Sequence, residues 1–375
     1  MTADAAARPA GEGNRIDRFL AILPKRSGSD LHLSVGCPPI VRIDGELERM
    51  RYRALTEGDF YNLLGPITPP RLWEDFNASG DVDFAYQMGQ QARFRVNLLR
   101  QERGSAAVLR LIPSRVPTVE DLNLPASVAG LYAMPRGMVL VTGPTGSGKS
   151  TTLAAILDRM NKRLAHHVVT IEDPIEFVHT NDKSVFTQRE IGPDVATFAE
   201  GVKAAIREDP DCLLVGEMRD IETMRMALTA AETGLLVFAT VHTNSAAKAV
   251  DRIIDAFPAG EQEQVRIVLA ETLRGVVAQQ LLRKKGGGRV AAHEVLIGSS
   301  ALSNSIREGK TSLINNQIAT GKSRGMISMD QTLTELVRND VVEPAEALER
   351  ALDKESFKTI LANLRKPGAA AAPSA

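Results

Sequence analysis

The sequence predicts an α/β protein whose core is a mainly parallel sheet, and three observations support this prediction. Short apolar runs alternate with helical patterns over residues 121–298. A glycine-rich segment, residues 143–150, joins one of these runs to a helix. A mixed pattern of strands and helices over residues 15–113 precedes them. Buried strands that alternate with helices are typical of a parallel sheet covered on both faces.

The division of the chain follows from composition and pattern. A chain of 375 residues has room for two or three domains of ~100–200 residues each. Both ends are rich in small and polar residues, which favours disorder. We therefore expect six segments: a disordered start at 1–14, an N-terminal α+β domain at 15–113, a linker at 114–120, an α/β core at 121–298, a helical C-terminal region at 299–366 and a disordered tail at 367–375.

Composition limits the function classes. The net charge of -1 and the aromatic content of 4% give little support to a nucleic-acid surface, which needs basic and stacking side chains. Cys37 and Cys212 are far apart and form no CxxC pair, so neither a zinc site nor a disulfide framework is indicated. The sequence has no run of ~18 apolar residues, the length of a membrane span, and residues 1–14 lack the apolar core of a secretory signal. We expect a cytoplasmic protein.

The elements of the N-terminal domain are predicted from alternation and turn signals. A short helix is expected first, and a second helical stretch is interrupted by prolines. The expected helical ranges are 15–22 and 52–73, and the expected strands are 30–33, 39–43, 82–87, 92–99 and 106–112.

The core is predicted from apolar runs of strand length and longer periodic stretches. The expected strands are 138–142, 167–171, 212–215, 235–241 and 290–297. The expected helices are 149–164, 220–233, 245–256 and 261–285, followed by a set of short helices after Gly298.

The most specific motif is a complete phosphate-binding loop of the form GxxxxGKS, which follows a strand and opens a helix as this motif requires. Its glycines let backbone N–H groups converge on phosphate oxygens, and the helix N-terminus adds positive potential. The lysine is expected to reach the β- and γ-phosphates of ATP and the serine hydroxyl to bind Mg²⁺. The predicted ATP-binding residues are Gly143, Pro144, Thr145, Gly146, Ser147, Gly148, Lys149, Ser150 and Thr151.

Three other strand ends carry polar groups. Residues 172–176 read Glu-Asp-Pro-Ile-Glu, and such carboxylates at the carboxyl edge of a parallel sheet can orient or deprotonate water; a solvated acidic loop is the alternative. The apolar run 212–215 leads to Glu217, an expected metal-site acid, with Gly216 where an Asp is common; the first turn of an acidic helix is the alternative. His242 follows the strand 235–241 and is expected to line the same site, although a lone histidine is often structural.

Taken in order, these segments resemble the secretion ATPase superfamily. The four motifs TIEDPIEF, REDPDCLLVGEMRD, TVHTN and the phosphate loop are similar to its Asp box, Walker B, His box and Walker A. More narrowly, SDLHLSVGCPPIVRIDGEL at 29–47, RFRVNLLRQ at 93–101, IREGK at 306–310 and GMISMDQTL at 325–333 resemble the type IV pilus retraction ATPases of the PilT type.

The resemblance implies a PAS-like N-terminal domain, a RecA-like core and a homohexamer that hydrolyses ATP and acts with pilus machinery and a platform protein of the inner membrane. It implies that Glu176 is the catalytic glutamate, that Glu217 acts on Mg²⁺ partly through water, and that His242 lines the site. It also implies nucleotide contacts across domains or subunits from four arginines, Arg95, Arg110, Arg136 and Arg252. The protein would act at the inner face of the cytoplasmic membrane.

One position departs from the family pattern, which is close to AIRNLIREGK. Ser305 stands in place of a leucine, and a hydroxyl at an apolar position is expected to weaken helix packing. An accessory retraction paralogue therefore stays open beside the main retraction motor. A pilus assembly or type II secretion ATPase is a further alternative, disfavoured by the absence of a four-cysteine metal insert. A nucleic-acid motor and a non-enzymatic nucleotide switch complete the alternatives.

Overall fold

A computed structural model describes residues 14–26, 28–43, 45–89, 91–112 and 115–364, and these divide into two compact units. The first unit holds the described part of Met1–Arg115 together with Pro174–Phe177, and the second holds Val116–Asp173 and the described part of Val178–Ala375. The predicted disordered tail at 367–375 lies outside the described residues, as does the predicted disordered start apart from Asn14. None of the helices in the described ranges is both long and apolar enough to cross a bilayer.

The first unit is built on an antiparallel sheet of six strands in the order β3-β2-β1-β6-β5-β4. In β5, buried and half-buried residues alternate, so one face of the strand packs on the core. The expected helix at 15–22 is two short helices instead of one. The elements are α1 (Asp17–Leu20), α2 (Ile22–Lys25), β1 (Gly28–Ser34), β2 (Ile40–Ile43), β3 (Glu46–Arg49), α3 (Glu57–Leu64), α4 (Pro70–Ser79), β4 (Asp81–Met88), β5 (Ala92–Gln101) and β6 (Gly104–Ile112).

The second unit is built on a sheet of seven strands in the order β13-β12-β7-β11-β10-β8-β9. All neighbours are parallel except β12 and β13, so the predicted α/β class with a mainly parallel core sheet is confirmed. The strands are β7 (Gly137–Thr142), β8 (His167–Glu172), β9 (Val185–Glu190), β10 (Cys212–Val215), β11 (Leu236–Val241), β12 (Leu273–Arg283) and β13 (Arg289–Ile297).

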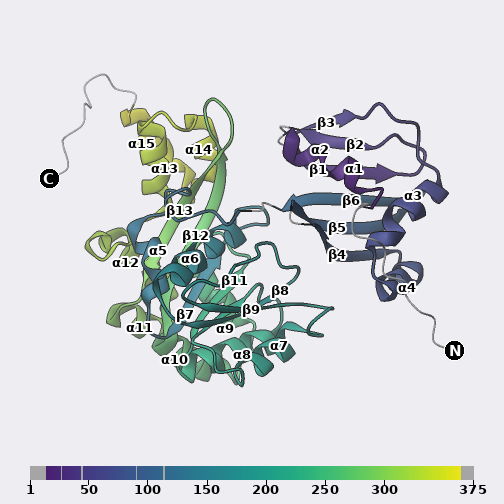
Figure 1. The fold of residues 1–375 in the computed structure, drawn as a ribbon. Coiled ribbons are helices and arrows are strands. Elements are labelled where there is room, and N and C mark those ends of the chain that lie inside the picture. Colours follow the sequence, from purple (N-terminus) through teal and green to yellow (C-terminus); the bar gives the residue numbers. More distant parts are fainter. Residues whose placement is uncertain (1–13, 27, 44, 90, 113–114, 365–375) are drawn as a thin grey trace. The chain divides into compact units, whose positions relative to one another are not determined.

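Helices cover this sheet and extend beyond it (Figure 1). They are α5 (Ala126–Ala129), α6 (Lys149–Arg163), α7 (Phe198–Ala205), α8 (Ile221–Glu232), α9 (Ala246–Asp255), α10 (Gln262–Thr272), α11 (Ser300–Arg307), α12 (Ile314–Thr320), α13 (Met329–Arg338), α14 (Pro344–Arg350) and α15 (Lys354–Leu364).

The central strand β7 shows why the sheet is covered on both faces. All six of its residues are buried. Met138 and Leu140 belong to one apolar cluster, whereas Val139 and Val141 belong to another. Successive side chains of a strand point to opposite faces, so an uninterrupted apolar run forms when each face meets a helix layer.

The single helix expected over 261–285 is wrong. Helix α10 ends at Thr272, and the chain continues as strand β12, which pairs with β7 and β13. The first eight of its eleven residues, Leu273 to Gln280, are all buried except Arg274, which is half-buried. A strand buried on both faces lacks polar alternation, so its pattern does not differ from that of a buried helix. Figure 1 shows β12 and β13 as a long hairpin that reaches helices α13–α15.

The sequence also did not predict β9 and α7. Strand β9 forms the edge of the sheet, and four of its six residues are only half-buried, so it lacks the apolar run that revealed the central strands. Helix α7 is short and is capped by Thr197, whose side chain accepts a hydrogen bond from the Glu200 N–H at 3.2 Å. Because the helix is short, its N-cap residue was recognised only once the structure was known.

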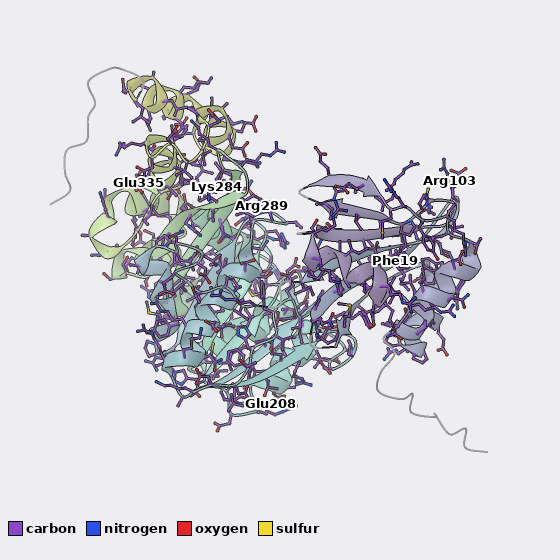
Figure 2. All side chains as sticks on the ribbon, turned by 45° about the horizontal axis from the view of Figure 1, so that its top comes forward. Phe19, Arg103, Glu208, Lys284, Arg289 and Glu335 are labelled. Carbon is purple, nitrogen blue, oxygen red and sulfur yellow. The ribbon has the colours of Figure 1, made fainter. Side chains whose placement is uncertain are left out.

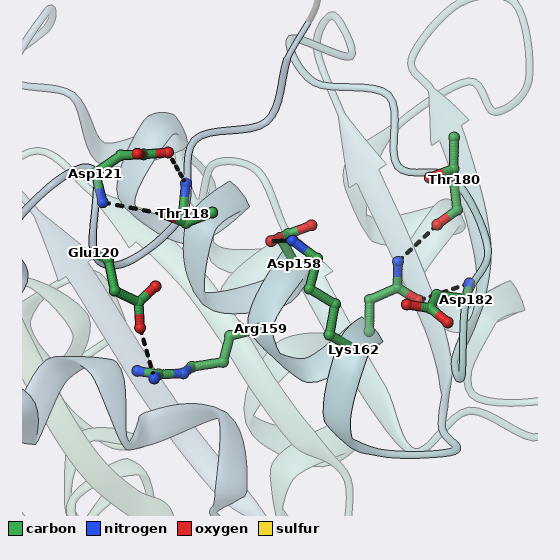
Figure 3. A network of polar contacts seen from close by, with 9 residues as sticks. Thr118, Glu120, Asp121, Asp158, Arg159, Lys162, Thr180 and Asp182 are labelled. Carbon is green, nitrogen blue, oxygen red and sulfur yellow. Dashed lines mark hydrogen bonds and ion pairs between the residues drawn. The ribbon is translucent and has the colours of Figure 1, made fainter.

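Helix α6, which follows the phosphate loop, is anchored at its far end by polar contacts (Figure 3). The Arg159 guanidinium donates to the Glu120 carboxylate at 2.8 Å. The buried Asn161 side chain donates to the Thr180 carbonyl at 2.6 Å and accepts from the Asp182 N–H at 3.1 Å. These contacts fix the helix to the segment before β7 and to the segment before β9.

The departure at Ser305 has a local compensation. Ser305 is buried in α11, and its hydroxyl accepts a hydrogen bond at 2.8 Å from the Gln317 side chain of α12. Gln317 also donates to the Ala301 carbonyl at 3.3 Å. A buried hydroxyl with a partner costs far less than an unpaired one, so the expected weakening of helix packing is offset.

We predict that Gln317→Leu destabilises the second unit by about 1–3 kcal/mol, because the buried Ser305 hydroxyl then loses its donor. Thermal unfolding would show this as a lower Tm. The matched control is Asn316→Leu, at an exposed neighbour on the same helix. The double variant Ser305→Ala with Gln317→Leu should regain much of the loss, and a Gln317→Leu protein that melts with the wild type would contradict the compensation.

Candidate active site

The phosphate loop spans the turn between β7 and α6 and depends on three glycines. Gly143, Gly146 and Gly148 have φ values of 152°, 77° and 85°, which side chains with a Cβ rarely adopt. A Cβ at Gly143 would collide with the backbone carbonyl of Gln279. The loop therefore holds this shape only with glycine at these positions.

The side chain of Gln279, in β12, holds the phosphate loop in place through hydrogen bonds. Its side-chain nitrogen donates to the Ser147 carbonyl at 2.6 Å, and its oxygen accepts from the Thr152 hydroxyl of α6 at 2.7 Å. Both contacts are buried. Sequence reasoning missed this residue because it placed Gln279 in a helix, whereas a strand beside β7 brings it under the loop.

Lys149 is buried at the start of α6. Its ammonium group donates to the carbonyls of Gly143 and Pro144 at 2.9 and 3.2 Å. The Ser147 hydroxyl is buried and has no hydrogen-bond partner in the described structure. A cationic group, an unsatisfied hydroxyl and backbone N–H groups at a helix N-terminus together fit a bound phosphate chain.

Glu217 and His242 meet at the carboxyl edge of the sheet. The His242 Nε2 lies 2.8 Å from the Glu217 carboxylate. Arg219 contacts the same carboxylate with two nitrogens, both at 2.6 Å. The sequence predicted the meeting of Glu217 and His242 but not the role of Arg219, which belongs to the same VGEMRD segment.

These neighbours set the charge of the acid. Burial raises the pKa of the Glu217 carboxyl, but the hydrogen bond from Arg219 and the electrostatic interactions with His242, Arg219 and Lys149 outweigh it, so the pKa lies below its usual value. Glu217 is therefore held as a carboxylate near the Lys149 ammonium. A carboxylate is the form that binds a magnesium ion or its water.

Hydrogen bonds across neighbouring strands fix the positions of these segments. The Thr142 hydroxyl, at the end of β7, donates to the Thr243 carbonyl at 2.7 Å and accepts from the Thr243 N–H at 2.8 Å. The Met218 N–H donates to the Thr240 carbonyl at 3.0 Å. The ends of β7, β10 and β11 are thereby joined, as expected for neighbouring parallel strands.

The structure explains why Gly216 stands where an Asp is common. A Cβ at this position would lie 3.0 Å from the Ile171 carbonyl and 3.3 Å from the Glu172 Cα. The Gly216 N–H also donates to the Ile171 carbonyl at 2.8 Å. The close approach of β8 crowds any side chain at this position, so Glu217 carries the negative charge at this strand end.

The acidic segment after β8 divides into two roles. The Glu172 carboxylate accepts hydrogen bonds from the Thr170 hydroxyl at 2.7 Å and the Gln188 side chain at 3.2 Å, so it ties β8 to β9. Glu176 lies in Pro174–Phe177, half-buried between the buried Ile175 and Phe177. Its catalytic role stays a prediction.

The four predicted arginines are not gathered at the phosphate loop within their own units. Arg110 donates to the buried Asp30 at 2.8 Å, and Arg95 lies 3.3 Å from Asp83, so both already have carboxylate partners in the first unit. Arg136 is exposed before β7, at the sheet edge opposite the loop, ~20 Å away over six strand residues. Arg136 therefore does not lie at the phosphate loop of its own unit. Arg252 is exposed on α9.

The described residues contain no group of three His, Cys, Asp or Glu side chains that could hold a metal ion alone. A magnesium site shared between protein and nucleotide needs no such group, because Mg²⁺ keeps several waters and binds substrate phosphates. Ser150, in the first turn of α6, and Glu217 fit that arrangement.

Comparison with known proteins identifies the family of this chain. The family of Type II/IV secretion system proteins matches residues 78–364. The chain belongs to this family. The type IV pilus retraction ATPase PilT of Pseudomonas aeruginosa is 49% identical over 342 residues, which cover 91% of this chain and 99% of that protein. A twitching motility protein of Neisseria gonorrhoeae is 48% identical, with 86% of each chain covered.

A solved structure of a related protein has the same fold as this chain. The crystal structure of the pilus retraction motor PilT with bound ADP matches with a TM-score of 0.85 and 41% identity, covering 93% of this chain and 100% of that chain. The relationship therefore extends over both units and supports a nucleotide-binding protein.

We predict that Gly216→Ala lowers stability by about 1–3 kcal/mol, because the added methyl forces β8 and β10 apart. The measurement is thermal unfolding, with Gly260→Ala as the matched control, since a Cβ at Gly260 meets no atom within 4 Å. Equal melting temperatures for the two variants would show that the strand contact does not exclude a side chain.

Proposed function

We propose that this protein is an ATP hydrolase that powers type IV pilus retraction. The observation that carries the proposal is the pairing of Glu217 with His242 at the same sheet edge as a complete phosphate loop. Such an edge provides groups that bind the phosphates and a charged group beside the terminal phosphate. The relatives named for pilus retraction and twitching motility match this chain over most of its length.

Each residue has a chemical role in this proposal. Lys149 would leave its loop carbonyls to bind the β- and γ-phosphates. When bound, Mg²⁺ would neutralise charge that develops on the phosphates, with Ser150 and Glu217 holding it directly or through water. Glu176 would orient and deprotonate the attacking water. His242 would sense the terminal phosphate through its contact with Glu217.

The assembly is also part of the proposal. Because Arg136 lies opposite its own phosphate loop, it would contact nucleotide only in a neighbouring subunit, as expected of a homohexameric ring. Arg252 is proposed to act in the same way. Arg95 and Arg110 would exchange their present carboxylate partners for phosphate during the cycle. The ring would work in the cytoplasm, at the inner face of the membrane, on a pilus platform protein.

The alternatives differ in what supports them. The pairing of Ser305 with Gln317 removes the packing objection to a main retraction motor, so we favour that role over an accessory paralogue. The two free cysteines, Cys37 and Cys212, supply no metal insert of the kind expected in assembly or secretion ATPases. The net charge of -1 gives no support to a nucleic-acid motor.

We predict that Lys149→Ala abolishes ATP hydrolysis, because the phosphates lose their cation.

We predict that Glu176→Gln keeps nucleotide binding but lowers kcat by a factor of about 10²–10⁴, the usual contribution of a general base. Steady-state hydrolysis and binding of a fluorescent ATP analogue separate the two effects. A Glu176→Gln protein with full turnover would refute the role of Glu176.

The biological function is tested by deleting the gene in its own bacterium and scoring surface pili and twitching. We expect excess pili that do not retract, restored by the wild-type gene and not by the Lys149→Ala gene. Loss of surface pili would instead identify an assembly motor, and an unchanged strain would point to an accessory paralogue.

A further inference from the structure

Strand β13 carries a buried acid, Glu294, outside the phosphate site. It is 3% exposed, and no cationic side chain forms an ion pair with it within the described parts of the chain. A buried carboxylate is stable only when hydrogen bonds or other charges replace its water. Its backbone partners must therefore supply this compensation.

The partners of Glu294 are the starts of two helices. The Ala246 N–H, the first of α9, donates to its carboxylate at 2.7 Å. The Met329 N–H, the first of α13, donates to the same carboxylate. The first N–H groups of a helix have no partner within it, and a helix N-terminus attracts negative charge. One side chain thus satisfies both helices.

The charge of Glu294 depends on these two contacts. Burial raises the pKa of its carboxyl, the hydrogen bonds from Ala246 and Met329 lower it, and the negative charge of Asp330 raises it, so that on balance the pKa lies above its usual value. Withdrawal of either helix start would leave the buried acid with still less compensation. The positions of the two helix starts therefore depend on each other.

Glu294 also lies between two apolar clusters. Residues two apart on a strand point to the same face, and its neighbours on this face are Ala292 and Leu296. Ala292 belongs to the cluster that contains the buried residues of α13, and Leu296 belongs to the cluster that contains those of α9. The carboxylate therefore links two helices whose buried residues lie in different clusters.

The start of α13 is fixed to β13 by further contacts on both sides of Glu294. Val295 exchanges two backbone hydrogen bonds with Ile327, at 2.7 and 3.1 Å. The Thr332 hydroxyl donates to the His293 carbonyl at 2.7 Å. Strand β13, Glu294 and the start of α13 therefore form one fixed group, and the hydrogen bond from α9 joins this group to the phosphate site.

The path from α9 to the phosphate site is short. Helix α9 begins at Ala246, four residues after His242. Between them, the Thr243 backbone is bonded to the Thr142 hydroxyl at the end of β7. A residue spans at most ~3.3–3.6 Å, so a segment of this length has little slack. A change in the position of His242 is therefore passed to Ala246.

We propose that Glu294 is a positioning residue that couples His242 at the phosphate site to the C-terminal helical region. This inference rests on the proposed function, because it takes His242 as the group that senses the terminal phosphate. When His242 is held by that phosphate, the start of α9 is held with it, and the carboxylate passes the restraint to the first N–H of α13. Couplings of this kind typically change a local equilibrium by a factor of about 5–150.

The test is hydrogen exchange followed by mass spectrometry on the full-length protein, with and without Mg²⁺ and the non-hydrolysable analogue adenylyl imidodiphosphate. Exchange is followed in the phosphate loop at 143–151, around His242 at 241–244 and at the start of α13 at 329–332. Glu294→Gln keeps the size of the side chain but removes its charge and replaces one acceptor oxygen by a donor. Glu335→Gln is the matched control, because it makes the same change at an exposed position of α13 (Figure 2).

A second variant breaks the same link from the other side. Ala246→Pro removes the N–H that donates to Glu294 and leaves the carboxylate in place. Proline is favoured at the first position of a helix, and the extended backbone of Ser245, with φ -150° and ψ 161°, suits a residue that precedes proline. Slowed exchange at the phosphate loop shows that each variant still folds and binds the analogue.

We expect the analogue to slow exchange in all three segments of the wild type and of Glu335→Gln, by about tenfold at 329–332. In Glu294→Gln and Ala246→Pro, the first two segments should still respond and 329–332 should not. A residue that only stabilises the fold would leave that response intact, so a wild-type response at 329–332 in either variant would overturn the coupling, as would its absence from the wild type. No slowing at the phosphate loop of the wild type would instead refute the proposed function.

Discussion

The structure depends on the close contact between the phosphate loop and strand β12. Gly143 packs against the Gln279 backbone with no space for a side chain, while the Gln279 side chain holds both Ser147 and Thr152. This contact fixes the loop relative to the sheet and fixes the start of α6 relative to the loop. Because the anchor comes from a strand residue 132 positions after Ser147 in the sequence, the loop acquires its shape only when the whole sheet has formed.

The same edge shows how the site holds opposite charges close together. Lys149 is buried, and Glu217 is mostly shielded from water. A buried charge is tolerated when it is paired and hydrogen-bonded. Lys149 rests on two carbonyls, and Glu217 is held by Arg219 and His242. Each group is therefore stabilised in its charged form, and each has partners that it can exchange for phosphate, metal or water.

Much of the fold and part of the site could be predicted from the sequence. The strands that carry the motifs, β7, β8, β10 and β11, are largely apolar runs followed by polar residues, so their ends were predicted to meet. Strand β12 was missed because a strand buried on both faces resembles a buried helix in sequence. That error hid the hydrogen bonds from Gln279 to the phosphate loop, since they depend on β12 lying beside β7. Gly216 and Ser305 differ from the residues usual at their positions, and the sequence did not explain why. The structure does, because β8 lies close to Gly216 and the Gln317 side chain bonds to Ser305.

The central claim is that the loop, Glu217 and His242 form one site around the phosphates of ATP. The most direct measurement is a crystal structure of this protein with Mg²⁺ and a non-hydrolysable ATP analogue. The claim predicts that the Lys149 ammonium leaves the carbonyls of Gly143 and Pro144 for the phosphate oxygens, with the metal between Ser150 and the Glu217 side of the site. An analogue bound elsewhere, with Lys149 still on its two carbonyls, would contradict it.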